Sequence, residues 1–347
     1  MRIEKLDAPW LAGVLGLVPD RVHGMRYAPL GTGQVADTYR VSYRVDDAAE
    51  QHVVLKLTSA DPASVTAGRH EQNFLREVRY YQVLAPQLSV RVPRCWHAEI
   101  DETGTDFVLV LEDLSACRPG DQLRGCTVDE AVAVLSEAAK LHAPRWGDPA
   151  LRDLAWLPGT IVPSDAALAA GPATFQKFCH RYTGQFDAEI TEVGRYLFDH
   201  LAEFYALKQN SIDTVQHGDF RPDNLLFGAA GDAPAVAVVD WQTVCRGSGV
   251  LDVSYFLGGS LPPEQRAEVE RDLLRHYHGE LRRLGVADYT FEDCWRDYTR
   301  FAFQGYWMGV LAAMAVKRTD RGDRMFAAMV QRAGRHASDL GAVGCLG

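Results

Sequence analysis

The chain has 347 residues, of which 47% are apolar and 24% charged, and this composition is typical of an ordinary globular protein. A chain of this length exceeds the usual size of a single hydrophobic core, so we expect one large domain or two smaller ones. The formal net charge of -10 argues against a nucleic-acid binder, because phosphate contacts need clustered Lys and Arg.

The cysteines and the apolar runs bear on compartment and on membrane association. The seven cysteines are scattered and form no C-x-x-C pair, which indicates free thiols in a reducing cytoplasm. The most apolar run, residues 301–316, is too short and too interrupted to span a bilayer, and it predicts a buried core helix. We therefore expect a cytoplasmic protein with no membrane anchor, and no obligate protein partner is implied.

In chain order, the first elements are strand-rich. Residues 1–20 predict a short amphipathic helix, and residues 27–57 alternate apolar with polar side chains, which predicts two or three antiparallel strands. Residues 67–88 have apolar side chains near helical spacing and predict one helix that ends at Pro86. Two more strands are expected within 90–101 and 106–114. A small strand-rich domain with one helix should therefore end within Glu112 to Ser115.

The rest of the chain is mainly helical in pattern. Residues 127–146 have a Thr cap, an acidic first turn and a stop at Pro144, and further helices are expected at 172–208, 263–284 and 291–316. Short apolar runs that end in polar loops separate them. The sequence thus predicts an α+β protein with a domain at 1–113 and a larger, mainly helical domain at 114–347.

The stretch "VQHGDFRPDNLLFG", residues 215–228, places acidic and amide side chains on a tight loop before an apolar "LLF". If Asp219 and Asn224 face one cavity, a carboxylate and an amide oxygen five residues apart could serve a proton and a metal ion. This pair suits phosphoryl transfer.

A glycine-rich turn lies between two expected strands. Gly31 and Gly33, in "GTGQVADTYRV", could let the backbone approach a phosphate, because glycine has no Cβ to block the contact. Taken alone, an ordinary hairpin turn is the simpler interpretation.

Lys56 is flanked by apolar residues in "VVLKL", on what we expect to be a central strand. An unpaired ammonium there would be costly, so it needs anionic partners. Glu77, on the following helix, can supply one carboxylate and nucleotide phosphates the rest. The alternative is an edge-strand lysine that faces solvent beside a surface glutamate.

Asp240 ends the apolar strand "AVAVVD", sixteen residues after Asn224. A carboxylate at a strand end beside an amide oxygen makes a hard-oxygen site for Mg²⁺, which takes one or two protein ligands and completes its shell with phosphates and water. The alternative is an aspartate that caps a loop.

These features occur in the order of the kinase template, in which Lys and metals bind phosphates and an Asp receives the hydroxyl proton. The chain resembles the aminoglycoside phosphotransferase and choline kinase superfamily, and looks closest to its branch of ecdysteroid-kinase-like small-molecule kinases. The motifs "HGDFRPDNLLF" and "VVDWQ" match closely, whereas "GTGQVADTYRV", "VVLKL", "REVRYYQVL" and "LVLEDLS" match loosely. The similarity runs from about residue 25 to residue 260.

The resemblance implies a two-lobed protein-kinase-like fold that binds ATP or GTP with Mg²⁺. It implies that Asp219 is the base that orients the acceptor hydroxyl and that Asn224 and Asp240 are the Mg²⁺ ligands. Lys56, held by Glu77, would contact the phosphates, and the glycine pattern departs from the family after Gly33.

The resemblance also implies supporting roles. The backbone from Leu111 to Asp113 would bind adenine, and Asp252 would brace the catalytic loop. We expect structural roles for His217, which would hold the turn, and for His142, which would pack beneath the loop.

The predicted function is ATP-dependent transfer of a γ-phosphate to a hydroxyl of a small molecule by direct in-line displacement. Two alternatives stay open: a nucleotide-binding pseudokinase scaffold, and a metal-dependent phosphohydrolase. The acceptor could be aminoglycoside-like, an amino alcohol, a sugar or a steroid-like alcohol. Ammonium groups would want carboxylates such as Glu292, Asp293 and Asp297, although a solvated helix face explains these residues too. An apolar alcohol would instead need an aromatic surface such as Tyr306 and Trp307. The alternative is that these two side chains belong to the core.

Overall fold

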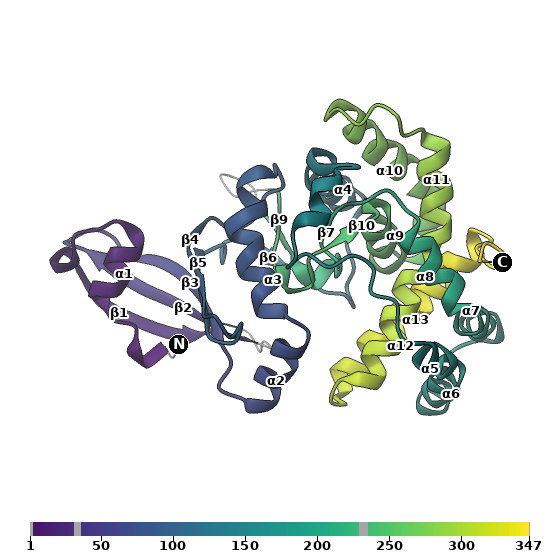
Figure 1. The fold of residues 1–347 in the computed structure, drawn as a ribbon, viewed down its shortest axis with the longest axis horizontal. Helices are drawn as coiled ribbons and strands as arrows, with labels where there is room; N and C mark the ends of the chain where they lie inside the picture. Colours follow the sequence, from purple (N-terminus) through teal and green to yellow (C-terminus); the bar gives the residue numbers. More distant parts are fainter. Residues whose placement is uncertain (1–2, 31–35, 229–234, 347) are drawn as a thin grey trace. The chain divides into compact units, whose positions relative to one another are not determined.

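A computed structural model describes residues 3–30, 36–228 and 235–346 (Figure 1). The chain divides into two compact units. The first contains Met1–Arg118 and Gly228–Val244, and the second contains Pro119–Phe227 and Cys245–Gly347. The segment Gly228–Val244, which carries Asp240, therefore packs with the N-terminal part of the chain although it lies far along the sequence.

The first unit is built on an antiparallel sheet of five strands in the order β1-β2-β3-β5-β4. The predicted strands are confirmed. Their bounds are β1 Val22–Pro29, β2 Ala36–Val45, β3 Gln51–Thr58, β4 Cys95–Ile100 and β5 Phe107–Glu112. A short strand, β9 (Val236–Val238), and a 3-10 turn, η8 (Trp241–Thr243), complete the unit from the later segment.

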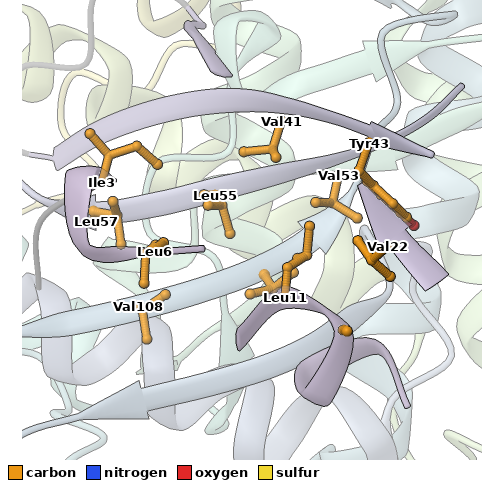
Figure 2. Packing of buried hydrophobic residues seen from close by; sticks show 12 residues of the cluster. Ile3, Leu6, Leu11, Val22, Val41, Tyr43, Val53, Leu55, Leu57 and Val108 are labelled. Carbon is orange, nitrogen blue, oxygen red and sulfur yellow. The ribbon is translucent and has the colours of Figure 1, made fainter. Parts of the chain in front are cut away.

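One face of this sheet packs on the N-terminal helix α1 (Ala8–Leu15). Side chains alternate across a strand, so Val53, Leu55 and Leu57 of β3 all point to this face and are buried. Figure 2 shows Leu11 of α1 among them, with no exposed surface. This apolar layer fixes the register of β3, and the alternation sends Lys56 to the opposite face.

The opposite face carries α3 (Asn73–Arg79), where Phe74 stacks on Phe107 of β5 with ring centroids 4.9 Å apart. The prediction of one continuous helix over 67–88 is wrong. The chain forms α2 (Pro62–His70), then α3, and then a π-helical turn, η3 (Tyr80–Leu84). The break occurs because Gln72 adopts a left-handed backbone with φ 56°, which no α-helix can accommodate.

The second unit is mainly helical, as predicted. The helix expected at 127–146 is α4 (Val128–His142), which begins with a capping box between Thr127 and Glu130. The helices that follow are α5 Asp165–Ala169, α6 Gly171–Arg181, α7 Ala188–Asp199, α8 Leu201–Gln209, α9 Gly249–Ser260, α10 Pro263–Arg283, α11 Phe291–Arg300, α12 Gln304–Ala315 and α13 Asp320–Asp339.

The helix α9 is the centre of the second unit. All twelve of its residues are buried, and α4, α10, α11, α12 and α13 pack around it. The run 301–316 forms a 3-10 turn and α12, and its inward side is buried, which confirms the predicted core helix. Along the described stretches of the chain, no helix combines the length and apolarity needed to cross a bilayer. The seven cysteines are all free.

A short β-ribbon frames the loop that carries Asp219. Strand β7 (Thr214–Gln216) enters the loop and pairs antiparallel with β10 (Cys245–Gly247), which leads into α9. The 3-10 turn η7 (Pro222–Asn224) and β8 (Leu225–Phe227) follow the loop. The remaining short elements are β6 Arg118–Pro119, η1 Ile3–Lys5, η2 Pro19–Arg21, η4 Ala85–Gln87, η5 Ala143–Arg145, η6 Pro149–Asp153 and η9 Phe301–Phe303.

Candidate active site

Three charged residues of the first unit meet on the α3 side of the sheet. The ammonium Nζ of Lys56 lies 2.7 Å from Oε2 of Glu77 and 2.8 Å from Oδ1 of Asp240. Strand β3 is the middle strand of the sheet, so the alternative of an edge-strand lysine facing solvent is wrong. We call Lys56, Glu77 and Asp240 the lysine cluster.

Burial and charge compete within the lysine cluster. The side chain of Glu77 is 3% exposed and that of Lys56 is 14% exposed, whereas Asp240 is 32% exposed. Burial acts to lower the pKa of Lys56, but the charges of Asp240 and Glu77 outweigh it, so this pKa is raised. Lys56 therefore stays cationic, and its outer partner Asp240 is the carboxylate that solvent reaches.

Glu77 also fixes the turn that presents Asp240. Its carboxylate accepts a hydrogen bond from the backbone N–H of Trp241. The indole of Trp241, which is fully buried, stacks on Tyr80 with ring centroids 3.7 Å apart and an interplanar angle of 6°. Asp240 itself has φ 67°, a left-handed backbone that is rare outside glycine and that concentrates at functional sites.

In the second unit, Asn224 and Asp219 are in direct contact. The amide nitrogen Nδ2 of Asn224 donates to the backbone carbonyl of Asp219 at 2.8 Å and to its Oδ2 at 2.9 Å. Both partners are acceptors, so the amide NH₂ must face Asp219 and the amide oxygen must face away. That oxygen accepts no hydrogen bond from any residue within 3–30, 36–228 and 235–346, which leaves it available to a ligand.

Two residues that sequence reasoning missed also hold the Asp219 carboxylate. Nε of Arg221 lies 3.1 Å from both Oδ1 and Oδ2, and the hydroxyl of Tyr255 donates to Oδ1 at 3.1 Å. We call Asp219, Arg221, Asn224 and Tyr255 the loop cluster. Arg221 stands two residues after Asp219 in the motif, which was a usable signal, whereas Tyr255 on α9 gave none.

The charge of Arg221 is the largest of the influences that lower the pKa of Asp219. Burial is the largest single influence and acts to raise the pKa of Asp219, but the positive charge of Arg221 together with His217 and Asn224 outweighs it. The pKa of Asp219 is therefore lowered, and the group is a carboxylate at neutral pH.

Asp252 supports this loop from α9. Its fully buried carboxylate accepts hydrogen bonds from the backbone N–H of His217 at 2.7 Å and of Gly218 at 3.2 Å. Gly218 has φ 83°, which glycine adopts without steric cost. The ring of His142 packs beside Asp252, with its Nε2 3.4 Å from Oδ2 of Asp252 and its Nδ1 2.8 Å from the hydroxyl of Tyr277. Asp252 therefore braces the loop and His142 packs next to it, as we expected.

His217 is fully buried, and its Nδ1 accepts a hydrogen bond from the backbone N–H of Asp219 at 3.3 Å. This contact lies within the turn, in agreement with the structural role that we expected for His217.

The predicted adenine contacts lie at the end of β5. Leu111 is buried, and the backbone N–H of Glu112 donates to the backbone carbonyl of Arg94 at 2.8 Å. The carboxylate of Asp113 accepts from Nε of Arg40 at 2.8 Å and from the backbone N–H of Ser115 at 2.9 Å. Gly31 and Gly33 lie outside the described residues.

The acceptor candidates separate clearly by burial. Tyr306 is 1% exposed and donates to the carbonyl of Ile190, so it is a core residue and cannot line an open pocket. Trp307 is partly exposed. Glu292 is exposed, whereas Asp293 and Asp297 line a cavity of about 340 Å³ together with Arg296 and Arg300. This cavity mixes charges of both signs.

The sequence model of the ecdysteroid kinase-like family matches residues 33–144 and 166–286, which is more than half of the chain. No curated protein sequence matches this chain.

Several solved structures share its fold. One is a proposed aminoglycoside phosphotransferase from Ralstonia eutropha JMP134, with 18% identity, 92% of this chain and 95% of that chain covered, and a TM-score of 0.50. Another is the GDP complex of wild-type aminoglycoside 2'-phosphotransferase-IIIa, with 13% identity, 89% and 92% coverage, and a TM-score of 0.53. A third is choline kinase from Cryptosporidium parvum Iowa II, with 12% identity, 89% and 88% coverage, and a TM-score of 0.51. These matches confirm the predicted α+β, protein-kinase-like fold.

Proposed function

The chain belongs to the ecdysteroid kinase-like family, and we propose that it is a small-molecule kinase that moves the γ-phosphate of ATP or GTP to a hydroxyl group. The acceptor would be a small hydroxylated molecule. The solved structures with this fold include a GDP complex, an observation made on that protein that supports nucleotide use here.

The observation that carries the proposal is the lysine cluster. A purely structural ion pair requires only one carboxylate. Lys56 instead lies on the middle strand of the sheet between the buried Glu77 and the more exposed Asp240. Nucleotide phosphates are a natural partner for Lys56, since an ammonium offsets their charge and Glu77 keeps it in place. The exposed partner, Asp240, would then be released from Lys56 to hold a metal.

Mg²⁺ fits the oxygen atoms that these residues offer. Asn224 directs its amide oxygen away from Asp219, and Asp240 carries a carboxylate on a constrained turn. Mg²⁺ prefers a few such hard oxygen ligands and takes the rest from phosphates and water. We propose that Asn224 and Asp240 hold the ion, which would neutralise charge on the phosphates.

Asp219 would act on the acceptor. We assign to it the acceptor hydroxyl, whose proton it would take as the new P–O bond forms. Its ionised state, its fixed orientation and its loop position support this role. No covalent intermediate is required, because positioning and charge supply most of the rate in phosphoryl transfer.

The nucleotide-binding role belongs, in this proposal, to an N-lobe of residues 1–113, and the acceptor-binding role to a C-lobe of residues 114–347. The backbone from Leu111 to Asp113 would bind the base, and the turn with Gly31 and Gly33 would approach the phosphates. These assignments rest on the family motifs.

A two-step assay tests the proposal. Nucleotide binding is measured with and without Mg²⁺, and ADP release is then measured with a library of hydroxylated compounds. A kinase releases ADP only when an acceptor is present. Binding without turnover would indicate a scaffold, and turnover without any acceptor would indicate a phosphohydrolase.

A further inference from the structure

We propose that Arg221 is a positioning residue for phosphoryl transfer, which locks the orientation of the Asp219 carboxylate. This inference rests on the proposed function. It gives the guanidinium of Arg221 a role beyond its effect on the pKa of Asp219.

The contacts at Asp219 single out Arg221. Tyr255 donates to Oδ1 and Asn224 donates to Oδ2, so each engages one carboxylate oxygen. Arg221 engages both, because its Nε lies 3.1 Å from each oxygen. Among the described residues it is the one side chain that spans the carboxylate, and a shared donor resists rotation about the bond that joins the carboxyl group to Cβ.

Arg221 is in turn held from its far side. Its Nη1 donates to the carboxylate of Asp223, and Oδ1 of Asp223 accepts the backbone N–H of Gln122 at 2.8 Å. The sulfur of Met325 on α13 lies 4.0 Å from the same Nη1. The side chain of Arg221 is only 19% exposed, so few other orientations are open to it.

This anchor reaches the helical core of the second unit. The side-chain amide of Gln122 donates to the carbonyl of Gly259 at 2.9 Å, near the end of α9. Arg332 of α13 donates to the carbonyl of Gln122 at 2.7 Å. A chain of hydrogen bonds through Arg221, Asp223 and Gln122 thus connects Asp219 to α9 and α13. It is separate from the hydrogen bonds that Asp252 accepts from the loop backbone.

The guanidinium shape is essential to this role. Nε and Nη1 lie in one rigid plane and point to different carboxylates, Asp219 and Asp223. Lysine keeps the charge but has a single nitrogen on a flexible stem, and glutamine lacks the charge and the reach. Charge alone therefore cannot replace Arg221, and a small misplacement of a reacting group costs on the order of 100-fold in rate.

The test compares Arg221→Lys and Arg221→Gln with wild type, using the acceptor that the library identifies. We expect kcat to fall on the order of 100-fold in both variants, because a displaced carboxylate no longer aligns the hydroxyl. The KM for nucleotide should change less than about threefold, which is the size of an effect that leaves the binding contacts in place. Arg321→Gln is the matched control, since Arg321 is an exposed arginine of α13 paired 3.2 Å from Asp121, and it should behave as wild type.

Chemical rescue separates positioning from general structural damage. In Arg221→Ala, added methylguanidinium should restore part of kcat, whereas methylammonium at the same concentration should not. Equal rescue by both cations, or a kcat for Arg221→Lys equal to that of wild type, would overturn the role proposed for the guanidinium. A wild type with no acceptor-dependent ADP release would instead overturn the proposed function itself.

Discussion

The side-chain amide of Asn224 donates both of its short hydrogen bonds to a single residue, Asp219, at 2.8 Å to the carbonyl and 2.9 Å to the carboxylate. This contact fixes the amide so that its nitrogen serves Asp219 and its oxygen points elsewhere. In the proposed mechanism, Asn224 would therefore both orient the base and offer an oxygen to the metal ion.

Asp240→Ala should lose nearly all turnover. Without this carboxylate Mg²⁺ would keep only the weak amide ligand of Asn224, and an uncompensated triphosphate cannot be aligned for transfer. ADP release at saturating nucleotide measures the effect. Asp20→Ala, a change at an exposed aspartate of the same unit, is the control and should leave the rate intact. Full activity in Asp240→Ala would rule out the metal assignment.

Lys56→Met should weaken nucleotide binding by roughly 10- to 100-fold, the value of a hydrogen bond to a charged group. Acceptor affinity should change less, because the ammonium is directed at phosphates in this proposal. Glu77→Gln should have a smaller effect in the same direction, since Lys56 keeps its charge but loses an ionic partner. Titration calorimetry with nucleotide measures both. A Lys56→Met variant with impaired acceptor binding alone contradicts the assignment.

Leu11→Ala should lower the free energy of unfolding by about 2–5 kcal/mol, the usual cost of a core leucine cavity. Leu11 is fully buried against the sheet, in the layer that sets the register of β3 (Figure 2). Val18→Ala, at a position that is 55% exposed, is the control and should cost less than about 0.5 kcal/mol. Denaturant titration measures both, and equal effects would contradict the packing described here.

Lys208 should make stability depend on alkaline pH. Its ammonium lies 5.1 Å from the ring centre of Trp307, and burial lowers the pKa of Lys208 to about 8. A lysine whose pKa is lower in the folded state penalises folding fully below about 8, and the penalty fades as pH rises toward the unfolded value of 10.5.

Thermal melting of wild type and Lys208→Met therefore tests this lysine between pH 7 and pH 10, where the wild type should gain stability relative to the variant as pH rises. Lys177→Met, at an exposed position of α6, provides the comparison. A constant difference between wild type and Lys208→Met across this range argues against the shift.

Local pattern predicted much of the lysine cluster. The apolar neighbours of Lys56 in "VVLKL" predicted a central strand, and Glu77 on the following helix was predicted as a partner of its ammonium. Asp240 as a second partner could not be predicted, because it lies 184 residues from Lys56 and its chain segment crosses back into the first unit. Its left-handed backbone is likewise set by tertiary packing, with Trp241 stacked on Tyr80.

The helix α9 shows a second limit. We expected polar loops and short apolar runs across its residues, yet Gly249–Ser260 is helical. Its twelve residues are all buried, so apolar side chains occur on every side and the helical period that reveals an amphipathic helix is lost. Tyr255, which holds Asp219, was missed for the same reason.

Asp219→Asn tests the central claim most directly. The amide keeps the shape of the carboxylate but cannot take a proton, so the variant should fold and should bind ATP with Mg²⁺ at near-normal affinity. Single-turnover transfer should fall on the order of 10²- to 10⁴-fold, the usual contribution of a positioned general base. Nucleotide affinity, melting temperature and transfer rate are measured on one preparation. A stable variant that transfers at the wild-type rate would contradict the catalytic role of Asp219.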